Sequence, residues 1–122
     1  MADVTMFELL DSFGLPWYRQ GSAPHDLPPV FLTEWEFDRD LFLKYDDDAA
    51  GECGVFSICL YTSDPARLDD LSAFCKYAKN AGFILRSLPR DVASGIEGYY
   101  GRQCEIYDVK LNKQAGDGSP KE

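Results

Sequence analysis

The sequence predicts an α+β fold: a mostly antiparallel sheet of four to five strands, two helices on one face and a protruding β-hairpin arm. Helical and strand patterns alternate irregularly, without the strand-helix repeat of parallel sheets. The 122 residues suffice for one core and not for two domains. Of these residues, 45% are hydrophobic, too many for a disordered chain. We therefore expect one domain over residues 1–111 and a disordered polar tail over 112–122.

The first helix is predicted from near Asp3 to Phe13. Its apolar residues recur at helical spacing, and they are Met6, Leu9, Leu10 and Phe13. Gly14 and Pro16 then end the helix, because glycine accepts the left-handed cap conformation and proline cannot continue a helix. Residues 16–29 contain four prolines and are predicted to be an irregular loop.

A hairpin arm is predicted over residues 36–54. The strand before it, Val30–Phe37, alternates with period two, and Asp38–Asp40 interrupts it before the short apolar stretch Leu41–Tyr45. An acidic turn follows, and we expect a solvated arm tip made of Asp46, Asp47, Asp48 and Glu52. Val55–Thr62 is apolar at both parities, which predicts a central strand buried on both sides.

The second helix is predicted to begin at Pro65, with Asp64 as its N-cap, and to end at Asn80–Gly82. Its predicted inward stripe is Leu68, Leu71, Cys75 and Ala78, flanked by Phe74 and Tyr77.

Two strands are predicted after this helix. Phe83–Leu88 reads as an edge strand, Arg90–Gly101 as a loop and Gln103–Leu111 as the last strand. Apolar residues of the last strand change parity, so either both of its faces are covered or a bulge lies near Ile106.

Charge and cysteine content restrict the function. With 21 acidic and 12 basic residues the net charge is -9, which repels phosphate and disfavours tight binding to DNA or anionic lipid. Residues 1–13 lack a basic and apolar leader pattern, so we expect an intracellular origin. The cysteines are Cys53, Cys59, Cys75 and Cys104, and their scatter predicts reduced, mostly buried thiols.

Candidate chemical sites are weak. Three consecutive aspartates lack the ligand spacing of a calcium loop, and Cys53 and Cys59 are too far apart for a zinc knuckle. His25 beside Asp26 could act as a base, although an exposed loop histidine explains it better. We expect no catalytic residues, no metal and no cofactor.

Several features in order resemble the tail completion or tail terminator proteins of long-tailed bacteriophages and prophages, which join the tail to the head. These features lie within residues 5–111: a first helix followed by Gly14-Leu-Pro-Trp-Tyr18, a double proline before Val30, and an aspartate-bearing segment from Asp38 to Asp48. They continue with Leu60-Tyr61-Thr62, Ser-Asp-Pro65 before an amphipathic helix, Gly82-Phe, and Gly98-Tyr99-Tyr100. The acidic hairpin and the four cysteines depart from that pattern.

The resemblance implies a non-catalytic ring, expected to be a hexamer, located in the tail or neck of the virion and in host cytoplasm during assembly. Its partners would be copies of itself, the major tail protein and head connector proteins, with no membrane involved. DNA would pass through without tight binding, and the net charge agrees with a passage of that kind. Candidate subunit contacts are the loop and arm aromatics Trp17, Tyr18, Phe42, Tyr45, Tyr99 and Tyr100.

Two alternatives remain open from the sequence. A small acidic phage or bacterial inhibitor could occupy a nucleic-acid-binding protein, with residues 46–52 imitating phosphate charge. A hydrolase that uses His25 with Asp26 is the third reading.

Overall fold

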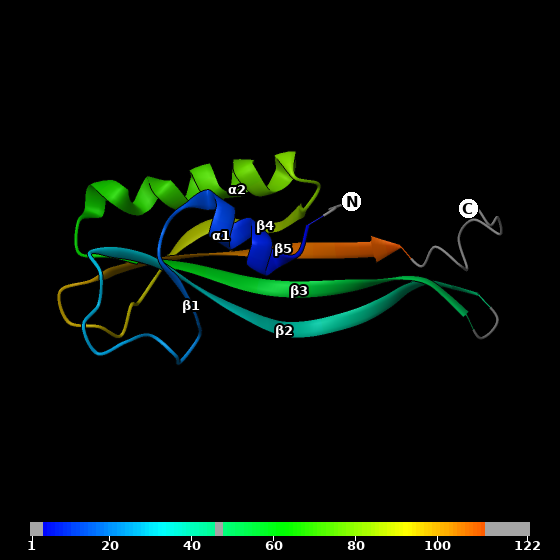
Figure 1. Ribbon diagram of the computed structural model, residues 1–122, viewed down its shortest axis with the longest axis horizontal. Coiled ribbons are helices and arrows are strands. Elements are labelled where there is room, and N and C mark those ends of the chain that lie inside the picture. Colours follow the sequence, from blue (N-terminus) through cyan, green and yellow to red (C-terminus); the bar gives the residue numbers. More distant parts are fainter. Residues whose placement is uncertain (1–3, 46–47, 112–122) are drawn as a thin grey trace.

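A computed structural model describes residues 4–45 and 48–111, with the side chains of 38–53 and 110–111 excepted (Figure 1). In chain order, the described elements are α1 (Met6–Phe13), β1 (Trp17–Arg19), β2 (Val30–Tyr45), β3 (Asp48–Thr62), the 3-10 turn η1 (Pro65–Asp69), α2 (Asp70–Asn80), β4 (Ile84–Val92) and β5 (Tyr100–Leu111).

The strands form a five-stranded sheet in the order β1-β2-β3-β5-β4. β1 runs parallel to β2, whereas the β2–β3, β3–β5 and β4–β5 pairs are antiparallel. Figure 1 shows α1 and α2 on the same side of this sheet. The predicted α+β class, the mostly antiparallel sheet and the central position of Val55–Thr62 are confirmed.

The hydrophobic core lies between the two helices and one face of the sheet. α2 contributes Leu71, Phe74, Cys75 and Ala78, and α1 contributes Met6, Leu9 and Leu10. Alternate residues of the inner strands meet them, namely Val30 and Leu32 of β2, Phe56, Ile58 and Leu60 of β3, and Cys104 and Ile106 of β5. Strand side chains that alternate in this way commit one whole face of the sheet to the core.

Both helices begin differently from the prediction. α1 starts at Met6, after a capping box in which the Thr5 hydroxyl accepts from the Glu8 backbone N–H and the Glu8 carboxylate accepts from that of Thr5. Asp64 caps η1 as a 3-10 turn, and α2 starts only at Asp70. A 3-10 helix has three residues per turn, whereas an α-helix has 3.6, so η1 changes which side of the following helix faces the core. As a result Phe74 is fully buried, while Leu68 is only half-buried.

The segment 16–29 is not wholly irregular, contrary to the prediction. Its residues Trp17–Arg19 form β1, held by backbone bonds of 2.9 Å from Leu32 N–H to the Pro16 carbonyl and from Gln20 N–H to the Glu34 carbonyl. A strand of three residues is too short to show a period, which is why the sequence pattern missed it.

Asp38–Asp40 does not interrupt the strand, which was also predicted wrongly. β2 continues through it, with a register shift between Glu36 and Asp38 that leaves Phe37 at a bulge. The bulge changes which face of the sheet the following side chains point to, while the hydrogen-bonded pairing of β2 with β3 continues.

Strand bounds at the other edge also differ. β4 extends to Val92 and β5 begins at Tyr100, so the predicted loop over 90–101 shortens to residues 93–99. Of the two alternatives for the last strand, a bulge within β5 near Ile106 is not seen in the β3–β5 ladder, which keeps one register throughout. The irregularities lie in β4 instead, around Ser87, where an edge strand tolerates them.

The predicted arm over 36–54 is described only in part. Its backbone follows the β2–β3 ladder to the pair Tyr45↔Asp48, and β5 accompanies β3 as far as Gly51↔Leu111. The tip residues 46–47 and the predicted tail 112–122 lie outside the described residues. Whether the arm protrudes therefore stays a prediction.

Truncating Phe74 tests the core. We expect Phe74→Ala to lower the free energy of unfolding by about 3 to 5 kcal/mol, because it leaves a cavity between α2 and the sheet. Leu88→Ala, at a side chain that is 75% exposed, is the apolar control and should cost less than about 0.5 kcal/mol. Urea unfolding measures both, and equal losses would contradict this assignment of the core.

Candidate functional site

The face of the sheet opposite α1 and α2 is the first candidate site. Its residues alternate with those of the core and include Trp35 and Phe37 of β2, Ser57 of β3, and Gln103, Glu105 and Tyr107 of β5. No described helix covers this face, and Figure 1 shows both helices on the other side. We name these six residues the open face.

Aromatic packing closes one end of that side of the sheet. Phe31 is buried there, with the rings of Tyr18, Tyr61 and Tyr99 at centroid distances of 5.8, 5.4 and 6.0 Å. The Tyr99 hydroxyl donates to the Pro28 carbonyl at 2.8 Å, which ties the 93–99 loop to the proline-rich loop. Burial, with the Cys59 thiol beside it, raises the pKa of Tyr61 to about 12.

Exposed aromatic rings characterise the open face itself. Trp35 is 45% exposed and Phe37 is 42% exposed. Together with Gln20, Ser57, Gln103 and Glu105 they line a shallow groove of about 240 Å³. Large rings in a polar setting are the composition found in the cores of protein interfaces.

The polar groups of the open face are held in place by their neighbours. The Arg86 guanidinium lies 5.6 Å from the Phe37 ring and 5.7 Å from the Tyr107 ring, and it pairs with Glu105 at 3.2 Å. Gln103 donates to the Ser57 hydroxyl at 2.6 Å. Since these side chains are already ordered, binding a partner would cost less conformational entropy.

The two edges of the sheet differ in how readily another strand could pair with them. β4 carries Pro89 and two register irregularities, features that blunt an edge. β1 covers β2 only over Leu32–Glu34. Within the described part of the chain, no strand lies beside the outer edge of β2 from Trp35 to Tyr45.

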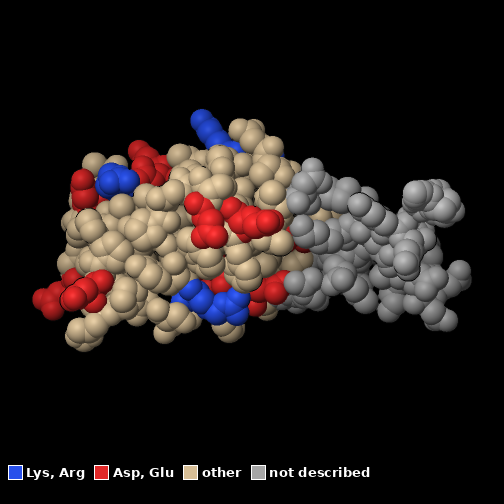
Figure 2. Space-filling view, in the orientation of Figure 1, with Lys and Arg blue, Asp and Glu red and all other residues tan. Residues whose placement is uncertain are grey.

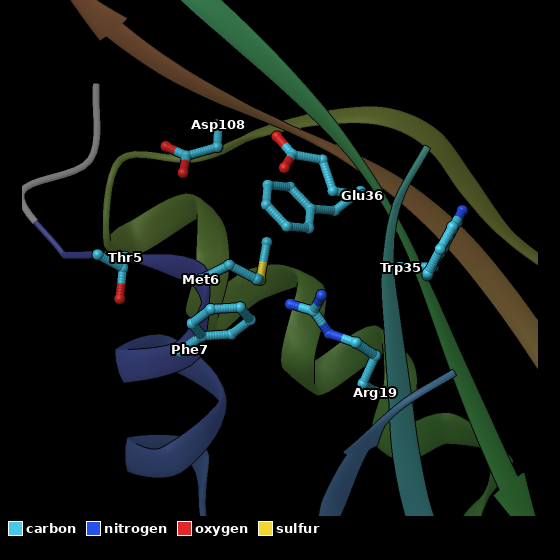
Figure 3. A pocket seen from close by; sticks show the side chains of 8 residues that line it. Thr5, Met6, Phe7, Arg19, Trp35, Glu36 and Asp108 are labelled. Atoms are coloured by element: carbon cyan, nitrogen blue, oxygen red, sulfur yellow. The ribbon is translucent and has the colours of Figure 1, made fainter. Parts of the chain in front are cut away.

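A second cavity, of about 350 Å³, lies beneath the start of α1 (Figure 3). Arg19, Met6 and Phe7 lie on one side of it, with Glu36 and Asp108 opposite them, while the Trp35 side chain points away across β2. Gly54 makes room for this arrangement, since a Cβ there would come within 2.6 Å of the Glu36 carboxylate.

An ion pair between the exposed Arg19 of β1 and the buried Glu34 of β2 lies beside this cavity. The Glu34 carboxylate is fully buried and lies 3.1 Å from Nε of Arg19, whose guanidinium stands 5.4 Å over the Phe7 ring. Phe7 in turn stacks on Trp17 at 5.6 Å. Burial raises the pKa of Glu34, Arg19 partly offsets the rise, and nearby Glu36 adds to it.

Charge is unevenly distributed on the surface. Figure 2 shows several small groups of acidic side chains on one face, with fewer basic groups and much uncharged surface between them. Among the described residues, no group of three or more His, Cys, Asp or Glu side chains could hold a metal ion. His25 is exposed in the proline-rich loop.

The structure divides the aromatic residues that the sequence singled out. Trp17 donates from Nε1 to Asp11 at 2.7 Å, and Tyr18 and Tyr99 pack on Phe31, so these three have partners within the chain. Tyr100 is exposed. Phe42 and Tyr45 lie on β2, where only the backbone is described.

The side chains of the predicted acidic arm tip are not among those that the structure describes. Asp46 and Asp47 lie outside the described residues, and Asp48 and Glu52 are described only as backbone of β3.

Trp35 and Phe37 are the surface residues that the sequence reasoning missed. Both have the parity of Phe31, which is buried, and only the exposure of that face distinguishes them. Three of the four predicted thiols agree with the structure, since Cys59, Cys75 and Cys104 are free and buried, whereas the side chain of Cys53 lies outside the described residues.

Comparisons with known proteins found no family model and no curated protein that matches this chain. In the part of the chain that the structure describes, no helix has the length and apolar content needed to cross a bilayer.

Replacing Glu34 tests the raised pKa. Between the ordinary carboxyl pKa and the raised one, the folded protein binds more protons than the unfolded chain, so the free energy of unfolding falls as pH rises. Glu34→Gln removes this contribution. We expect the stability of the variant minus that of the wild type to increase as pH rises from about 4 to about 7.

Urea unfolding at several pH values measures that difference. Arg19→Gln is the companion variant, and it should steepen the decline with pH because Arg19 lowers the pKa of Glu34. A Glu34→Gln difference that stays flat or falls with pH would contradict the direction of the shift.

Proposed function

We propose that this chain is a structural subunit of a long-tailed phage or prophage, one that completes or terminates the tail tube and joins it to the head as a ring. The observation that carries the assembly part of the proposal is the outer edge of β2 beyond Glu34, which has no described strand beside it and lies next to the exposed rings of Trp35 and Phe37. The assignment to a phage tail is supported by the resemblance of residues 5–111 to tail completion and tail terminator proteins.

Strand addition is the mechanism of assembly. The outer edge of β2 between Trp35 and Tyr45 has the length of two average strands. A strand from a neighbouring subunit can satisfy such an edge through backbone hydrogen bonds. If the two contacting surfaces differ, the contact is heterologous, and repeating it closes a ring when the rotation between neighbours divides a full turn.

The open face supplies apolar contact next to that edge. Trp35 and Phe37 belong to the edge strand itself, so a neighbour that pairs with β2 comes to lie beside both rings. Aromatic residues that become buried in this way contribute most of the binding energy of many interfaces. Tyr100, Phe42 and Tyr45 are further proposed contacts with neighbouring subunits.

The net charge of -9 suits a ring through which DNA passes. Each phosphate neutralised by a lysine or arginine adds affinity, whereas acidic walls let the duplex move. The subunit acts in the tail or neck of the virion after assembly in host cytoplasm, with the major tail protein and head connector proteins on its two sides.

Adding charge to the open face should disrupt assembly. We expect Trp35→Glu with Phe37→Glu to weaken self-association by about 30-fold, the equivalent of about 2 kcal/mol. Ala73→Glu with Asn80→Glu is the matched control, since it adds the same charge at exposed positions of α2. Light scattering and electron microscopy, with and without purified tail tubes, measure ring formation.

Two results would contradict the proposal. One is absence of the chain from purified virions by mass spectrometry, and the other is equal loss of assembly in both double variants. Charge reversal of Asp46, Asp47 and Asp48 separates the inhibitor alternative: loss of capture of a DNA-binding host protein, with assembly intact, would favour the inhibitor.

A further inference from the structure

Two thiols from different elements meet in the core. Cys75 of α2 and Cys104 of β5 are both buried, and their sulfur atoms lie 3.5 Å apart, within hydrogen-bonding distance. They are 29 residues apart in sequence, so only the packing of α2 on the sheet brings them together. A disulfide has sulfurs about 2 Å apart, and closing the remaining gap requires a shift of about 1.5 Å.

Cys75 is also reachable from the surface. It lines a pocket of about 180 Å³ between α2 and β4, together with Ser72, Lys76 and Lys79 of α2 and with Leu88 and Pro89 of β4. Leu88 is mostly exposed and β4 is an edge strand, so the wall of the pocket opposite α2 is only loosely packed. Cys104 does not line this pocket.

The surroundings favour ionisation of Cys75 over Cys104. Hydrogen bonding between Cys75 and Cys104, with a smaller contribution from the Lys79 charge, keeps the pKa of Cys75 below its ordinary value despite burial. The same hydrogen bond and burial raise the pKa of Cys104. Thiolates react much faster than thiols, so Cys75 is the thiol of this pair that reacts first.

We propose that Cys75 is a peroxide-sensitive thiol, reached through the pocket between α2 and β4, and that Cys104 is the thiol that resolves its oxidation to an internal disulfide. The oxidant in this proposal is hydrogen peroxide, which is small enough to enter the pocket of about 180 Å³.

The chemistry takes two steps. The Cys75 thiolate attacks one peroxide oxygen, the O–O bond breaks, and the departing hydroxide takes a proton to form water, which leaves a sulfenic acid. Cys104 then attacks the sulfenic sulfur, the S–O bond breaks, and a second water leaves with the Cys104 proton. Two thiols are oxidised by two electrons, one peroxide is reduced to two waters, and α2 becomes covalently tied to β5.

Peroxide treatment of the folded full-length protein, followed by peptide mapping, tests this proposal. We expect a Cys75–Cys104 disulfide with loss of two hydrogen atoms in mass, in the wild type and equally in Cys59→Ser and Cys53→Ser. Cys104→Ser should stop at a sulfenic acid on Cys75 that dimedone captures, and Cys75→Ser should form neither product.

The rate of Cys75 oxidation in Lys79→Gln is a second test, because this rate would not change if Cys75 only filled space in the core. It should slow the oxidation of Cys75 at neutral pH by at least about twofold, because removing the cation raises the thiol pKa and lowers the thiolate fraction. Ser72→Ala, at another lining residue of the same pocket, is the matched control and should not change the rate.

The proposal is overturned if both thiols stay reduced in the folded protein and react only in urea, or if Cys104 is oxidised in Cys75→Ser as readily as in the wild type. These oxidation experiments do not depend on whether the protein is found in virions or forms rings. The redox proposal and the proposed function can therefore be contradicted separately.

Discussion

Packing of α1 and α2 on one face of the sheet is the constraint on which the rest of the structure depends. Phe74 and Leu71 of α2 fit against alternate residues of β3 and β5, and this contact decides which parity of each strand is buried. The strand side chains that point away from the helices are then exposed to solvent wherever no loop packs against them. The open face with Trp35 and Phe37 is thus the other side of the same packing arrangement.

The central strand gives this arrangement its length. β3 pairs with β2 on one side and with β5 on the other, and both ladders continue past the part of the sheet that the helices cover. β1 shields β2 for only three residues, so the outer edge beyond Glu34 has no strand beside it in the described chain. A sheet with one blunted edge and one long edge is suited to directional contacts between copies.

Polar groups inside this fold depend on partners from other elements. Glu34 is buried on β2 with Arg19 of β1 as its counter-charge, and Cys75 of α2 lies against Cys104 of β5. Burial raises the pKa of Glu34, whereas the hydrogen bond with Cys104 lowers the pKa of Cys75 against the effect of burial. The packing that creates the core therefore also sets the charge state of the groups within it.

The sequence by itself determined the elements that have a strong local period. The stripe of Met6, Leu9 and Leu10 predicted α1, and the apolar stretch ending at Thr62 predicted the central strand, because helix and strand periodicities are local properties of the chain. Free, buried thiols also followed from composition and spacing.

Only the tertiary structure decided the rest. The parallel pairing of β1, the continuity of β2 through Asp38–Asp40 and the 3-10 start of the second helical segment all depend on neighbours distant in sequence. The side chains of Trp35 and Phe31 point to the same face of β2. Neither the strand period nor the composition tells which of the two is covered by other side chains. That difference arises because the Tyr18, Tyr61 and Tyr99 rings reach Phe31 and no described helix covers Trp35.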